Sequence, residues 1–116
     1  MALFNFFKKK PIQDIIEQAV IINFKYGKTD LSDLFSLENR LEDFLKDKNI
    51  GDLDGHEIAV DGSDGFLYLY GNNAQLLFDT IVPILKEAPF MEKAKIHLRF
   101  GDVNDIDTKT INFILE

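Results

Sequence analysis

The sequence contains no cysteine and no tryptophan, and it has only three prolines in 116 residues. Without cysteine there can be no disulfide framework, thiolate zinc site, iron–sulfur cluster or cysteine nucleophile. No apolar run approaches the roughly 20 residues that a membrane-spanning helix needs. The lack of thiols fits a reducing compartment, and we expect the protein to be cytoplasmic.

Basic residues are also in short supply. Lys and Arg number 13 against 20 Asp and Glu, which gives a net charge of −7. Because a phosphate backbone is bound through a footprint of Lys and Arg, we do not expect a nucleic-acid partner. The acidic balance suits a basic partner protein, and it is equally typical of a charged, solvated surface that has no further role.

The first 18 residues form a predicted N-terminal extension. Phe4, Phe6 and Phe7 precede the lysines at 8–10, whereas a signal peptide carries its charges before the apolar stretch. Pro11 is suited to the first turn of a helix, so a short helix over 11–18 is predicted in a partly flexible segment. The apolar pattern from 12 to 24 is also compatible with one longer helix.

Residues 19–116 are predicted to form a single α+β domain. Alternating or helical spacing of apolar residues marks each element. The expected elements are a strand at 20–26, a helix ending near 47 after the cap types Thr29, Asp30 and Ser32, a turn at 52–55, strands at 56–60 and 66–70, a helix capped by Asn72 or Asn73 and ended by Pro89, and strands at 94–100 and 108–115.

This order predicts a ferredoxin-like βαββαβ fold with an additional C-terminal strand. Two helices should cover one face of an antiparallel sheet, and the last strand should extend one edge as a hairpin. The other sheet face must then be solvated or paired. Folds of this kind commonly dimerise or bind ligands there, which is an argument from analogy alone.

Several carboxylates are predicted to gather at one end of the sheet. They come from the segment that leads into the strand at 56–60 and from the last turn: Asp52, Asp54, Glu57, Asp102 and Asp105. Asp also fills tight turns by bonding to the local backbone, and no spacing here matches a calcium-binding loop. We therefore predict neither a metal site nor a cofactor.

Strand 66–70 is apolar on both faces. Phe66, Tyr68 and Tyr70 share one face, while Leu67 and Leu69 share the other. We favour the aromatic face as the one that packs on the helices. If the aromatic residues are exposed instead, they are typical anchors for a partner.

The sequence contains no motif for nucleophilic catalysis or phosphate binding. His56, Glu57 and Tyr70 are the polar groups best placed for a small-molecule or catalytic site, which is the alternative hypothesis. The favoured hypothesis is a non-enzymatic protein-interaction module, either a homodimer or a binder of another, basic protein, as in an immunity-type inhibitor. Its predicted binding residues are Asp52, Asp54, Glu57, Tyr68, Tyr70, Asp102 and Asp105.

Several short runs resemble a group of small uncharacterised bacterial α+β proteins. They are Asp54-Gly55-His56-Glu57, Asp61-Gly62-Ser63-Asp64-Gly65, Leu67-Tyr68-Leu69-Tyr70-Gly71, Ile81-Val82-Pro83-Ile84-Leu85 and Leu98-Arg99-Phe100-Gly101. The resemblance extends over roughly residues 34 to 101. It implies a compact α+β fold and a bacterial, cytoplasmic setting, and it implies no activity and no catalytic residue.

Overall fold

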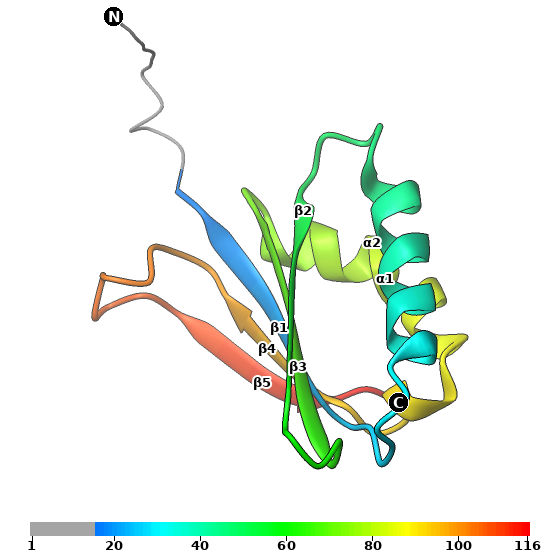
Figure 1. The fold of residues 1–116 in the computed structure, drawn as a ribbon. Helices are drawn as coiled ribbons and strands as arrows, with labels where there is room; N and C mark the ends of the chain where they lie inside the picture. The colour runs from blue at the N-terminus through cyan, green and yellow to red at the C-terminus, as the bar shows by residue number, and fades with distance from the viewer. Residues whose placement is uncertain (1–15) are drawn as a thin grey trace, which may run out of the picture.

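The computed structural model describes residues 16–116, which form five strands, two α-helices and one short 3-10 helix (Figure 1). In chain order these are β1 (Gln18–Lys25), α1 (Ser32–Leu45), β2 (Asp52–Ile58), β3 (Asp64–Gly71), α2 (Ala74–Lys86), η2 (Pro89–Met91), β4 (Lys95–Arg99) and β5 (Thr110–Ile114).

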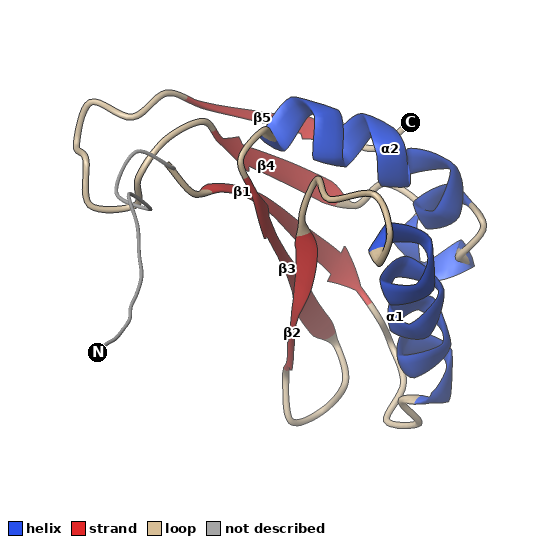
Figure 2. Ribbon diagram, turned by 90° about the horizontal axis from the view of Figure 1, so that it is seen from above, coloured by secondary structure: helices blue, strands red, loops and turns tan. Residues whose placement is uncertain are grey.

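The strands form one sheet in the order β2-β3-β1-β4-β5, and every neighbouring pair is antiparallel. Both helices lie against the same face of this sheet, and no helix of residues 16–116 lies on the opposite face (Figure 2). The predicted α+β class, with two helices and a final β4–β5 hairpin at the edge, is confirmed. Within residues 16–116, neither helix is long and apolar enough to cross a membrane.

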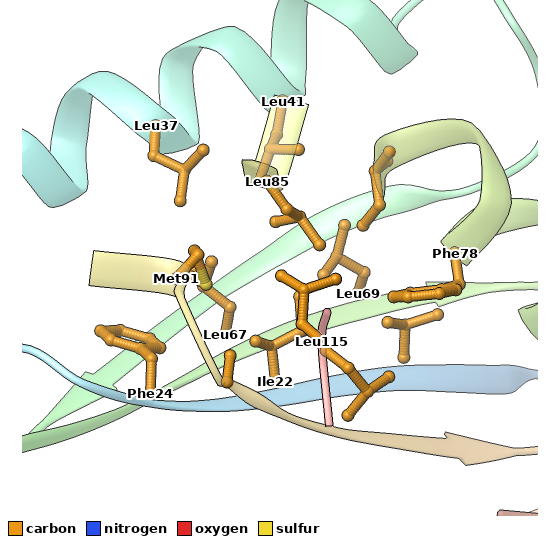
Figure 3. Packing of buried hydrophobic residues seen from close by; sticks show 14 of the residues in the cluster. Ile22, Phe24, Leu37, Leu41, Leu67, Leu69, Phe78, Leu85, Met91 and Leu115 are labelled. Atoms are coloured by element: carbon orange, nitrogen blue, oxygen red, sulfur yellow. The ribbon is translucent and has the colours of Figure 1, made fainter. Parts of the chain in front are cut away.

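The hydrophobic core lies between the helices and the sheet (Figure 3). Helix α1 places Leu34, Leu37, Leu41 and Leu45 on one side at helical spacing, and all four are buried. The sheet contributes alternate residues of its three central strands, and α2 and η2 close the remaining sides. These further core residues include Val20, Ile22, Phe24, Leu67, Leu69, Phe78, Ile81, Leu85, Met91, Ile96 and Leu98.

The aromatic face of β3 is not part of this core, so the favoured prediction for that strand is wrong. Leu67 and Leu69 are fully buried, while Tyr68 and Tyr70 are only partly buried. The physical reason is the register: Leu67 pairs with Ile22 and Leu69 with Val20, and these β1 residues also face the helices. The aromatic side chains therefore lie on the helix-free face.

The start of α1 is stabilised only in part as predicted. Its N-cap residue is Leu31, which makes no side-chain cap bond. The Leu34 amide, one of the free donors of the first turn, donates to the Tyr26 hydroxyl at 3.3 Å, and that hydroxyl donates to the Asp30 carbonyl at 2.6 Å. Asp30, one of the predicted cap residues, accepts a hydrogen bond from the Ser32 amide at 2.9 Å, so a local carboxylate and the residue that directly follows β1 both bind donors of the first turn. The other helix matches its prediction, because the Asn73 side chain accepts a hydrogen bond from the Leu76 amide.

Two element boundaries differ from the sequence-based prediction. The segment 52–55, predicted as a turn, is the first half of β2, because Asp52 and Leu53 pair with β3 and a register shift follows between Leu53 and Gly55. At the N-terminus, Gln18 already belongs to β1, so a helix continuing to residue 24 is wrong. The rest of the predicted helix at 11–18 lies largely outside the described residues.

Candidate functional site

The sheet surface opposite the helices, here called the open face, is built from three cross-strand rows and a shorter fourth row, in which Lys25 pairs with Asp64. Pairing along the strands sets each row, since directly opposed residues point to the same side. The first row runs Asp52–Tyr70–Ala19–Arg99–Thr110, the second Gly55–Tyr68–Ile21–His97–Asn112, and the third Glu57–Phe66–Asn23–Lys95–Ile114.

The centre of the open face is apolar and aromatic. Phe66 and Tyr68 stack with ring centroids 6.1 Å apart and planes 17° from parallel. A shallow hollow of about 510 Å³ lies beside them, lined by residues that include Ile21, His97 and Ile114. Ile114, which lines this hollow, has 41% of its surface exposed. Within residues 16–116 neither helix covers this surface, and Ile21, Phe66 and Tyr68 on it are only partly buried.

Tyr68 is held in place by an acidic neighbour on β2. Its hydroxyl donates to the Glu57 carboxylate at 2.5 Å, which links the aromatic centre to the β2 edge. This hydrogen bond to Glu57, assisted by partial burial and by the negative charge of Glu57, raises the pKa of Tyr68 to about 12 from its usual 10.0. Tyr68 is therefore neutral at physiological pH, and its ring is fixed against the sheet.

We expect substitution of Glu57 by glutamine to lower the pKa of Tyr68 towards its usual value, because the main cause of the shift is removed. Ultraviolet absorbance of tyrosinate during a pH titration measures this pKa, and the Tyr68→Phe variant shows which part of the absorbance change comes from Tyr68. The upward direction of this pKa shift also predicts how the free energy of unfolding depends on pH. Unfolded Tyr68 ionises near pH 10.0, so its stabilising contribution is complete below that pH and is lost as the pH rises towards 12. An unchanged tyrosine titration in Glu57→Gln would contradict the assignment.

Charge is divided across the open face. At the β2 edge, Asp52 and Glu57 are exposed carboxylates, each at the end of a row. On β4, Lys95 and Arg99 occupy the same two rows. Arg99 is oriented by hydrogen bonds from its guanidinium to the carbonyls of Gly101 and Glu17, at 2.8 and 3.1 Å. The face thus has an acidic edge, an apolar centre and a basic side.

The predicted acidic residues do not form one cluster. Asp52, Asp54 and Glu57 lie on β2, whereas Asp102 and Asp105 lie in the loop that follows β4, which is three strand spacings, or about 14 Å, away across the sheet. Asp102 and Asp105 accept hydrogen bonds from backbone amides two residues later, at 2.8 and 2.9 Å, as turn-forming aspartates do. In the region 16–116, no three potential metal-ligating side chains come together.

His56 points away from Glu57 and Tyr70. Its Nδ1 lies 2.9 Å from a carboxylate oxygen of Glu38 on α1, and its ring lies 5.9 Å from that of Phe35. Neighbouring residues of a strand point to opposite faces, so Glu57 reaches the open face and His56 the helix side. The side chains of the three residues of the alternative small-molecule site therefore point to two faces, although all three residues line one shallow hollow at the β2 edge.

Sequence reasoning missed both the pair of His56 with Glu38 and the basic side of the open face. Glu38 and His56 are 18 residues apart, and no local spacing signals their contact. The alternation of Lys95, His97 and Arg99 with Ile96 and Leu98 was the available signal for a basic strand face.

Comparison of this chain with protein-family models, with curated proteins and with solved structures finds no match. The geometry described above is therefore the basis for the functional argument.

Proposed function

We propose that this protein is a non-enzymatic protein-interaction module that binds its partner through the open face. The observation that carries the proposal is the aromatic centre formed by Phe66 and Tyr68, which neither α1 nor α2 covers. Tyrosine at the centre of a surface, with charged residues around it, is typical of protein interfaces. The hydrogen bond from Tyr68 to Glu57 fixes the ring before binding, so little side-chain entropy is lost when a partner packs on it.

We also propose that the domain is a ferredoxin-like βαββαβ arrangement in which β5 extends the sheet. The strand order β2-β3-β1-β4 and the antiparallel pairing support this assignment. A small-molecule-binding or enzymatic function on the same scaffold ranks second in our proposal. It ranks second because His56 contacts α1 whereas Glu57 contacts Tyr68 on the other side of the sheet.

An immunity-type inhibitor remains one specific form of the proposal. Asp52, Asp54 and Glu57 on the exposed β2 edge would be its charge complement for a basic enzyme. Asp102 and Asp105 would contribute only if the partner extended across the whole end of the sheet.

Site-specific photo-crosslinking in the cells that make the protein tests the proposed function. A photoreactive phenylalanine analogue replaces Tyr68, and a matched control carries it at Glu42, an exposed position on α1. We expect a discrete protein adduct from position 68, heavier than the 13.3 kDa chain, and none from position 42. The absence of any adduct from position 68, or equal adducts from both positions, would overturn the proposal.

A further inference from the structure

We infer that the occupant of the open face is a second copy of this chain, related by a two-fold axis that runs parallel to the strands between β1 and β3. This inference rests on the proposed function and names its partner. It comes from the arrangement of charge over the three cross-strand rows. Face-to-face packing of two sheets about such an axis is a standard arrangement in proteins.

The axis follows from the strand order. With the axis between β1 and β3, rotation places β3 of one copy over β1 of the other, and β2 over β4. The aromatic residues of β3 then pack against Ile21 of the second copy, and the apolar centres of both faces bury each other. Burial of apolar surface from both copies supplies the main stabilisation.

The charges select this axis over its alternative. A two-fold axis parallel to the strands keeps the position along the strand, so each row of one copy lies over the same row of the other. Glu57 and Lys95 share the third row, and Asp52 and Arg99 share the first. Each carboxylate of β2 therefore faces a basic residue on β4 of the second copy, and this happens twice in each row. A two-fold axis that is parallel to the sheet but perpendicular to the strands would instead place β2 over β2. It would bring the β2 carboxylates of the two copies together, which is unfavourable.

The size of the face sets the expected affinity. With this axis four strands of each copy overlap, because β5 lies over no strand of the second copy. Four strands at about 4.8 Å give a width of about 19 Å, and three rows give a length of about 20 Å, so the interface is at the small end of specific interfaces. We expect a dissociation constant in the micromolar range. Higher salt should weaken the dimer, because the charge pairs at its rim are screened.

A charge exchange between Glu57 and Lys95 tests the axis in the full-length chain. In Glu57→Lys or Lys95→Glu alone, like charges face each other twice, and the dissociation constant of the dimer should rise by about tenfold or more. In an equimolar mixture of the two variants, every pair is again of opposite sign, so a mixed dimer should form. The double variant Glu57→Lys/Lys95→Glu should also regain the homodimer. Sedimentation velocity or light scattering over a range of concentrations measures all four samples.

Matched controls change the same charges elsewhere. Glu42 lies on α1 and Lys46 directly follows this helix as its C-cap residue; both are exposed and outside the open face, so Glu42→Lys and Lys46→Glu should leave the dimer unchanged. Far-ultraviolet circular dichroism confirms that each variant is folded. Equal loss of dimer in the α1 controls would mean that net charge alone is responsible, and this result would overturn the inference.

The remaining outcomes separate this inference from the proposed function. If the wild-type protein is a monomer at all concentrations, a second copy is not the occupant of the open face. A dimer whose stability does not change on charge reversal at Glu57 or Lys95 also overturns the inference, because such a dimer would pair elsewhere, for example through the β5 edge. If position 68 still crosslinks to a different protein, the interaction module stands and only its partner changes. If position 68 crosslinks to nothing, the proposed function itself fails.

Discussion

Replacement of Leu67 by alanine should lower the free energy of unfolding by about 3 kcal/mol. Leu67 is fully buried between the sheet and the helices, so truncation removes several methyl and methylene contacts and leaves a cavity. Tyr68, its neighbour on the same strand, lies on the open face. Tyr68→Ala should therefore cost no more than about 1 kcal/mol in the monomer. Denaturant unfolding followed by circular dichroism measures both.

The contrast between these two substitutions decides which face of β3 the core uses. If the aromatic face packed on the helices, as the sequence alone favoured, Tyr68→Ala would be the more damaging change. That order of the two losses would contradict the fold described above. Measurement at low protein concentration keeps any association through the open face out of the comparison.

Replacement of Gly62 by alanine should cost about 3 kcal/mol, because two effects add. Gly62 has a φ of +76°, a conformation that alanine adopts with strain. A Cβ atom at this position would also lie 2.0 Å from the Lys28 carbonyl oxygen, which is far inside contact distance. The clash pushes apart the β2–β3 turn and the segment after β1, where the Gly27 amide donates to the Gly62 carbonyl at 2.7 Å.

Gly27 supplies the matched control for this prediction. Its φ is +81°, nearly the same as that of Gly62, but nothing lies within 4 Å of the Cβ that alanine would add. Gly27→Ala should therefore cost only the backbone strain, about 1 kcal/mol. Equal losses at the two glycines would show that the contact with Lys28 is unimportant. The difference between the two variants isolates the steric contribution.

The sequence predicted the order of the elements because their apolar periodicities are clear. It could not predict which face of β3 is buried, since Leu67 and Leu69 on one side and Phe66 and Tyr68 on the other are all large and apolar. Only the pairing register, which places Leu67 beside Ile22, resolves the choice. Register depends on contacts between distant segments, and local pattern carries little information about it.

The start of β2 was missed for a related reason. Asp and Gly at 52–55 have low strand propensity, and their composition is typical of a turn. Hydrogen bonds to β3 override that preference. The candidate site was predicted in part: Tyr68 and Glu57 were named, and the structure joins them by a hydrogen bond. The basic residues opposite them became visible only when strand order placed β4 on the other side of the same face.

The two outer strands of the sheet differ in a way that bears on fibre formation. β2 carries exposed carboxylates and an irregular register between Leu53 and Gly55, and both features oppose the addition of another strand. β5, from Thr110 to Ile114, contains no charged residue. Addition of one sheet to another edge to edge is therefore favoured along β5 and opposed along β2. A β5–β5 contact uses both available edges and ends with two copies, whereas an unlimited stack of sheets needs a free edge on each side.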